Sequence, residues 1–141
     1  ITPDVTSVIH PHGSPLDMRK FEDPAYVVPA GYIPQMGPNL YRVVAHNGAV
    51  TSVTIRASSR DTPAKPISGE EVTLPYGLTA TLAVNSGIRD KNDTGCEIYV
   101  KSGGKTFVMV SPANPNFDFR AVATSANFAY LITQALAASE S

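Results

Sequence analysis

The sequence predicts a mainly β domain of the α+β class: an antiparallel sheet or sandwich, preceded by an extended proline-rich N-terminal arm and followed by a C-terminal amphipathic helix. Three observations predict it. Asn47-Gly48 separates two segments of alternating apolar and polar residues, the last residues repeat apolar side chains at helical spacing, and seven of the 12 prolines fall in the first 38 residues. Alternation is typical of strands, and proline disfavours helices. We therefore divide the chain into an arm, residues 1–39, and a β domain with a C-terminal helix, residues 40–141.

The arm is extended because each proline fixes φ and removes an amide donor. We expect two short strand-like pieces in it, at Asp4–His10 and Ala25–Val28. The arm holds more apolar side chains than a solvated tail would carry, so we expect it to pack on a larger surface. Val8 and Ile9 are our candidates in the arm for a contact between subunits.

The β domain opens with a hairpin, because Leu40–His46 and Ala49–Ala57 flank Asn47-Gly48, a strong signal for a tight turn. A polar, proline-containing loop follows, and then a series of short strands joined by glycine-containing turns. The remaining strands are predicted at Glu71–Leu74, Leu78–Val84, Cys96–Lys101, Lys105–Ser111 and Phe117–Ala123.

The end of the chain predicts one amphipathic helix over about 124–138, with Thr124 or Ser125 as its N-cap. Its outer face carries no charged residue, which favours packing on two sides and hence contact with a partner subunit. The alternative, a helix lying over the sheet of its own chain, is the more common arrangement. The apolar stripe that would form the oligomer interface is Phe128, Leu131, Ile132 and Leu136, together with Ala135.

Composition and motifs argue against several classes of protein. The chain has 141 residues, a net charge of −1 and one cysteine, so neither a disulfide framework nor a cysteine-rich zinc site is available. No apolar run approaches the roughly 18 residues of a membrane-spanning helix. There is no nucleophile elbow or phosphate-binding loop, Glu70 and Glu71 would face opposite ways on a strand, and Cys96 opens an apolar strand. We predict no catalytic residue, no enzyme activity and no cofactor.

His10-Pro11-His12 is the best metal candidate, since two imidazoles at this spacing can approach one ion. The pair is similar to the first motif of cupins, which implies a metalloenzyme, but the nearby glutamate and the preceding strands of that family are missing. We favour surface histidines and predict no metal. Asp90–Gly95 resembles the start of a calcium loop, yet Lys101 stands where the bidentate glutamate would be.

Nucleic-acid binding has a specific candidate surface. Thr79 and Thr81 on one strand, with Tyr99 and Lys101 on another, would present hydroxyls, an aromatic ring for base stacking and a cation on one sheet face. Acidic and basic residues nearly balance, so we expect weak non-specific binding to phosphates. The alternative is an ordinary solvated sheet face.

From Leu78 onward the order of elements resembles the coat proteins of single-stranded RNA phages: LTATLAV, GCEIYVK, KTFVMVS, FDFRAVA and then TSANFAYLITQALAAS. The resemblance covers about half the chain. It implies that Thr79, Thr81, Tyr99 and Lys101 face the genome and that the apolar stripe of the helix lies over a partner's sheet. The family has two C-terminal helices, where this sequence predicts one, and a shorter N-terminal hairpin in place of the arm.

These observations predict a viral structural protein located in the virion, a capsid coat or decoration subunit that acts by self-assembly. The expected partner is the chain itself, with genomic RNA or another capsid protein as further candidates. An alternative is a carbohydrate- or receptor-binding β-sandwich module, for which Tyr26, Tyr32 and Tyr41 are the candidate aromatic residues. A cupin-like site at His10 and His12 is the third hypothesis.

Overall fold

The computed structural model describes residues 16–18, 20, 25–29, 32–34, 37–45, 47–58, 65–85 and 94–138. Strands dominate this part of the chain and two helices end it, so the predicted mainly β class is confirmed. The elements in chain order are β1 Leu16–Asp17, β2 Gly37–Val44, β3 Val50–Ser58, β4 Glu70–Leu74, β5 Leu78–Ala83, β6 Cys96–Ser102, β7 Lys105–Ser111, α2 Phe119–Ala123 and α3 Ala126–Ala138.

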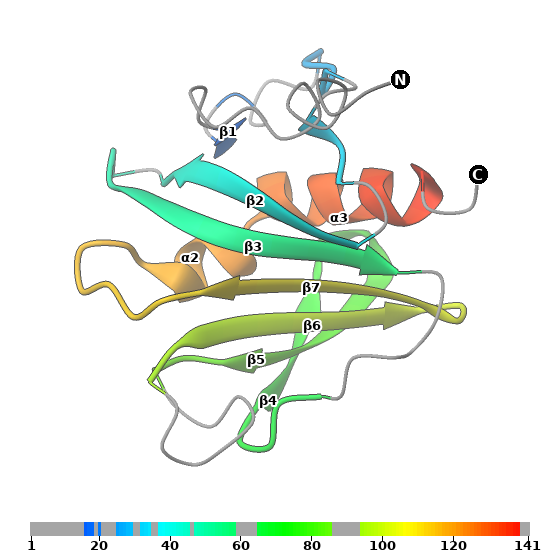
Figure 1. The fold of residues 1–141 in the computed structure, drawn as a ribbon. Helices are drawn as coiled ribbons and strands as arrows, with labels where there is room; N and C mark the ends of the chain where they lie inside the picture. Colours follow the sequence, from blue (N-terminus) through cyan, green and yellow to red (C-terminus); the bar gives the residue numbers. More distant parts are fainter. Residues whose placement is uncertain are drawn as a thin grey trace.

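The strands form one seven-stranded sheet in the order β1-β2-β3-β7-β6-β5-β4 (Figure 1). β1 pairs with β2 in parallel, and every other pair is antiparallel, so the sheet is mixed. The chain crosses from β3 to the far edge at β4 and returns strand by strand to β7, which pairs with β3. Of the two predicted arrangements, sheet or sandwich, the structure therefore has the single sheet.

The hairpin predicted at Asn47-Gly48 is confirmed, and so is a glycine-containing turn between the strands predicted at Cys96–Lys101 and Lys105–Ser111. In the β2–β3 turn Gly48 has φ +87°, and the Ala45 amide donates to the Ala49 carbonyl at 2.9 Å. In the β6–β7 turn Gly103 and Gly104 also have positive φ. Positive φ is a conformation that glycine adopts without steric cost, which is why these two sequences reverse the chain so tightly.

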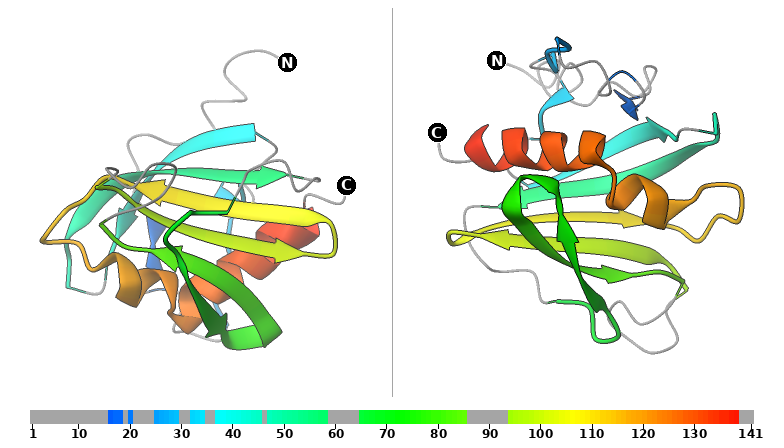
Figure 2. Two further views of the ribbon diagram at one scale, coloured as in Figure 1. Left: turned by 90° about the horizontal axis from the view of Figure 1, so that it is seen from below. Right: turned by 180° about the vertical axis from the view of Figure 1, so that it is seen from behind.

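The core lies between the sheet and the helices, which cover the same face (Figure 2). Alternate side chains of each strand point toward this core, as in Val53 and Ile55 on β3 and Phe107 and Met109 on β7, all at most 1% exposed. The β4–β5 hairpin also meets the helices, since the ring of Tyr76 in its turn lies 6.3 Å, centroid to centroid, from that of Tyr130 on α3.

Parts of the arm belong to this core. Leu16, Met18, Val28 and Ile33 are buried in the same apolar cluster as the sheet and helices. The predicted strand-like piece at Ala25–Val28 is not a strand, and the short β1 at Leu16–Asp17 was not predicted. A two-residue strand is too short to show an alternating pattern in the sequence. The described part of the arm contributes single buried apolar side chains to the core.

Asp4–His10, with the interface candidates Val8 and Ile9, lies outside the described residues. The other arm candidates, His10 and His12, lie outside them as well.

The largest correction concerns Phe117–Ala123, which was predicted as a strand. Phe119–Ala123 forms helix α2, and the Asp118 carboxylate accepts a hydrogen bond from the Ala121 amide at 3.1 Å. This cap stabilises the first turn. The chain therefore has two C-terminal helices where one was predicted.

The terminal helix α3 is confirmed, beginning at Ala126 within the predicted range. Ser125 caps it, because the Phe128 amide donates to the Ser125 hydroxyl at 3.1 Å. At the other end the Lys105 ammonium donates to the Leu136 carbonyl at 3.2 Å, a favourable position for a cation near a helix C-terminus.

Candidate nucleic-acid interface

The sheet has a second face, directed away from the helices, which we call the outer face. Strand pairing places Thr81 of β5 opposite Tyr99 of β6, and Tyr99 opposite Val108 of β7. Val108 in turn lies opposite Arg56 of β3. Directly opposite residues point to the same side of a sheet, so these four side chains form one row across the outer face.

A pocket of about 160 Å³ opens at the end of this row. All four residues predicted to contact nucleic acid, Thr79, Thr81, Tyr99 and Lys101, line it, so the structure brings the predicted set together. The pocket is smaller than the roughly 300 Å³ or more of a typical small-molecule site, which fits a short group better than a large enclosed ligand.

Two charged residues of this pocket, Lys65 and Glu71, were not among the predicted set. Glu71 of β4 lies opposite Thr81 of β5. The turn at Pro75–Gly77 fixes the register of these two strands, so this register would have placed Glu71 beside Thr81. Lys65 lies in a loop between strands, and no sequence pattern relates such a loop to β5 or β6.

The pocket walls differ in accessibility. Thr79 and Lys101 are exposed, whereas Thr81 is 9% and Tyr99 only 6% exposed. Stacking of a base needs an open ring face. The Tyr99 ring is too covered for the stacking role that we expected. The exposed residues of the predicted set are Thr79 and Lys101.

The outer face carries more cations than the composition suggests. Arg42 and Arg56 are exposed on β2 and β3, and Lys65 and Lys101 are exposed beside the pocket. The described acidic residues of this face are Glu71 in the pocket, Glu97, which is fully buried, and the half-buried Asp17, which lies opposite Val44. Two other acidic groups, Glu70 and Asp118, belong to the start of β4 and the cap of α2.

The near-neutral net charge therefore conceals an unequal distribution over the described surface. A surface with several cations attracts polyanions even when the whole chain is neutral.

The predicted interface stripe lies elsewhere. Phe128, Leu131 and Ile132 are 0% exposed, and Leu136 is 7% exposed, all within the core cluster of their own chain. This corrects the expectation that they cover a partner's sheet, because the sheet they pack against is their own. The physical reason is the sheet's inner face, whose apolar side chains are covered by α3 together with α2 and buried residues of the arm.

The tyrosines of the carbohydrate-binding alternative are not gathered on an open surface. Tyr41 is 2% exposed in the core, while Tyr26 and Tyr32 are half-buried against it. Burial raises the pKa of the Tyr41 hydroxyl. An exposed three-tyrosine platform is therefore not formed by these residues.

Cys96 is buried at the start of β6, as expected for a small apolar residue. Its sulfur donates to the Asn85 side-chain oxygen at 3.5 Å, and burial raises the pKa of the thiol. A raised pKa keeps the thiol protonated and unreactive at neutral pH. Among the described residues, no three His, Cys, Asp or Glu side chains lie close enough to hold a metal ion.

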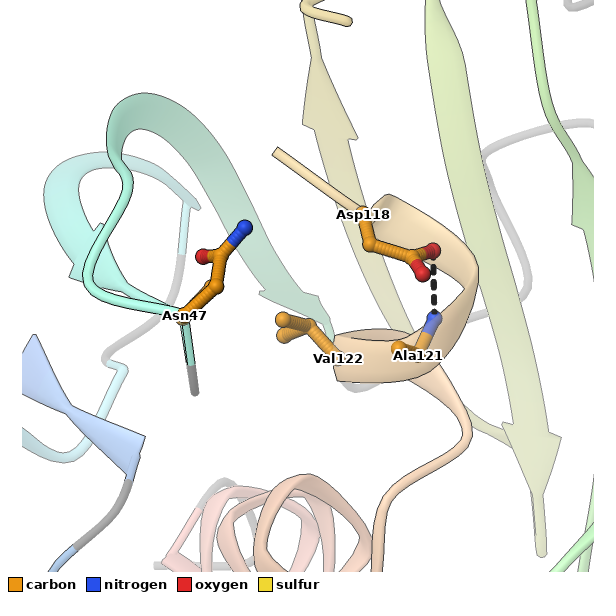
Figure 3. Close-up of a pocket in the computed structure, with 5 residues that line it drawn as sticks. Asn47, Asp118, Ala121 and Val122 are labelled. Atoms are coloured by element: carbon orange, nitrogen blue, oxygen red, sulfur yellow. Dashed lines mark hydrogen bonds between the residues drawn. The ribbon is translucent and has the colours of Figure 1, made fainter. Parts of the chain in front are cut away.

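A second pocket, of about 170 Å³, lies between the β2–β3 turn and α2 (Figure 3). Ala45, Ala121 and Val122 give it largely apolar walls, and Asn47 and Asp118 are its polar residues. Since the Asp118 carboxylate already caps α2, this pocket offers no pair of groups for acid–base chemistry.

No protein-family model, curated protein or solved structure matches the chain. The helices of the described part are too short to cross a membrane.

Proposed function

We propose that the chain is a virion structural protein, a coat or decoration subunit that acts by self-assembly. The proposal requires one surface that contacts other copies of the chain and a second surface that faces either the interior or the exterior of a particle. Two surfaces of the described part of the chain support it.

The observation that carries the proposal is the uncharged outer surface of α3. Its exposed side chains are Ala126, Thr133 and Ala137, and Tyr130 and Gln134 are half-buried. These positions recur at three- and four-residue spacing, so they form one stripe along the helix. A solvated surface helix usually carries charges on its outer side. Interface cores are depleted in charged residues, as this stripe is.

The chain also has different chemistry on its two sides. The helix layer presents the uncharged stripe, and the outer face of the sheet presents Arg42, Arg56 and Lys101. Such a division suits a shell subunit, which contacts neighbours through one surface and a polyanion through another. The two C-terminal helices and the antiparallel strands before them agree with the element order of the phage coat proteins.

Size-exclusion chromatography with light scattering tests self-assembly. We expect the full chain to elute as a dimer or larger assembly at micromolar concentration. Thr133→Lys, which places a charge in the centre of the stripe, should shift the protein toward monomer. Thr54→Lys on the outer face is the matched control and should leave the mass unchanged. A monomer at all concentrations, or equal effects of both substitutions, contradicts the proposal.

A second function, nucleic-acid binding at the outer face, is favoured by one observation: the four predicted contact residues line one pocket, among exposed cations. With Tyr99 covered, contacts to phosphate and sugar would dominate over base stacking. Anisotropy titration with labelled single-stranded RNA of mixed sequence tests this function. Saturable binding that weakens with salt supports it, and no binding at low salt contradicts it.

A further inference from the structure

The Asn47 side chain joins the β2–β3 turn to the loop before α2. The Asn47 amide nitrogen donates to the Asn116 carbonyl at 3.2 Å. In Figure 3 the Asn47 side chain lies across the second pocket from Asp118, with Val122 between them. The contact therefore connects one end of the sheet with the segment that caps α2, and it depends on Asn47 remaining an amide.

Asn47 also stands next to a residue that favours its chemical conversion. Gly48 follows it, has no Cβ, and nothing lies within 4 Å of the position where a Cβ would be. Gly48 therefore has no side chain that would crowd an approach to its own backbone nitrogen. The Ala49 amide donates to the Asn47 side-chain oxygen at 3.0 Å, which polarises the carboxamide and makes its carbon more electrophilic. Both residues are exposed to water.

We propose that Asn47 is a self-modification site. The Gly48 nitrogen attacks the side-chain carbonyl carbon of Asn47, a carbon–nitrogen bond forms, and the bond to the amide nitrogen breaks. Ammonia leaves with the proton of the Gly48 amide, and a five-membered imide remains. Water then opens the imide at either carbonyl, which gives aspartate or isoaspartate. The reaction consumes only water and needs no cofactor or oxidant.

The fold sets the rate of this reaction. The Gly48 amide donates to the Ala45 carbonyl at 3.0 Å, and this hydrogen bond must open before the nitrogen can attack. Conversion is therefore slower in the folded chain than in the unfolded chain. It remains faster than at asparagines in strands, such as the buried Asn39, where a following side chain blocks the approach.

The product changes the contact that Asn47 maintains. A carboxylate has no hydrogen to donate to the Asn116 carbonyl, and it places a second negative charge across the pocket from Asp118. Like charges at close range repel, and an acceptor facing an acceptor costs stability. Conversion therefore loosens the attachment of α2 to the β2–β3 turn, as a one-way change that accumulates with time.

Peptide mapping of the aged full chain tests the chemical step. The tryptic peptide spanning residues 43–56 contains Asn47 as its one asparagine or glutamine, so a mass shift from amide to acid identifies the site. We expect conversion there to exceed that at Asn39 in the folded chain, and to accelerate when urea unfolds the chain. Conversion no faster than at Asn39, or insensitive to unfolding, would overturn the proposal.

Hydrogen exchange tests the consequence. Asn47→Asp imitates the product. Asn47→Gln is the matched control, because glutamine keeps an amide that can donate and forms its six-membered imide more slowly than asparagine forms the five-membered one. We expect loss of protection at the Ala121 and Val122 amides in N47D and little change in N47Q. Equal protection in both variants would overturn the loosening. If N47D fails to fold, the same exchange measurement on wild-type protein before and after ageing decides between the two results.

Discussion

Phe107 of β7 and Phe128 of α3 meet edge to face, with their ring centroids 5.7 Å apart and their planes at 72°. Both rings are fully buried. This geometry is the favoured one for aromatic pairs, because the positive edge of one ring meets the negative face of the other. The contact fixes α3 to the sheet of its own chain, which leaves the uncharged stripe on the opposite side of the helix as its surface for a partner.

Phe128→Ala should therefore lower the free energy of unfolding of the chain by about 3–5 kcal/mol, the usual cost of removing a buried phenylalanine. Urea denaturation followed by circular dichroism measures it. Thr133→Ala, on the exposed side of the same helix, is the control and should change stability by less than about 0.5 kcal/mol. Comparable losses in the two variants would show that α3 is not attached as described.

Arg56→Ala and Lys101→Ala should each weaken binding of single-stranded RNA if the outer face contacts phosphates. Each removed contact is expected to reduce the slope of log affinity against log salt by roughly 1 or slightly less. Lys20→Ala, an exposed lysine of the arm, serves as the control. Unchanged slopes in both outer-face variants would place RNA binding, where it is observed, on another surface.

The stability of the chain should fall at alkaline pH through Tyr41. Burial raises the pKa of its hydroxyl above the ordinary value of 10.0, so the unfolded chain loses this proton before the folded chain does. The contribution of Tyr41 is complete below pH 10.0 and is lost as the pH rises beyond it. Tyr41→Phe should unfold with a shallower alkaline decline than wild type. If the denaturation midpoints of wild type and Tyr41→Phe fall equally as the pH rises above 10.0, the assignment of the alkaline decline to Tyr41 is contradicted.

The ion pair between Glu70 at the start of β4 and Arg120 on α2 should contribute little. Their side chains are 56% and 51% exposed, and exposed pairs are typically worth about 0.2–1 kcal/mol because water screens them. A double-mutant cycle with Glu70→Gln and Arg120→Gln measures the coupling. A coupling energy well above this range would mean that β4 is held to the helix layer electrostatically rather than by packing at Tyr76 and Tyr130.

Local patterns predicted most of the elements of this fold. Asn47-Gly48 determined one hairpin and Gly103-Gly104 another, because turns with positive φ are specified by their own residues. The helix α3 was also predictable from the sequence. Its apolar residues recur at helical spacing along thirteen residues, and a capping residue precedes them. The four predicted residues lie on one face because side chains alternate between the two faces along β5 and β6.

Other features depend on contacts that no local pattern encodes. Residues 117–123 fit both a strand and a short helix, and the structure selects the helix, with Asp118 as its cap and Phe119, Val122 and Ala123 buried. The apolar stripe of α3 alone does not say whether the helix covers a partner's sheet or its own. The pairing of β3 with β7 joins distant segments of the chain, so the strand order of the sheet could not be predicted. The burial of Tyr99 also depends on tertiary contacts, so the limited access to its ring could not be predicted.

Negative-stain electron microscopy of the purified full chain tests self-assembly, the central claim, most directly. We expect rings, shells or another regular assembly of uniform size, and we expect Thr133→Lys to reduce their number while Thr54→Lys does not. A field of dispersed particles of monomer size for the wild-type chain, at concentrations where light scattering also gives the monomer mass, would contradict the account.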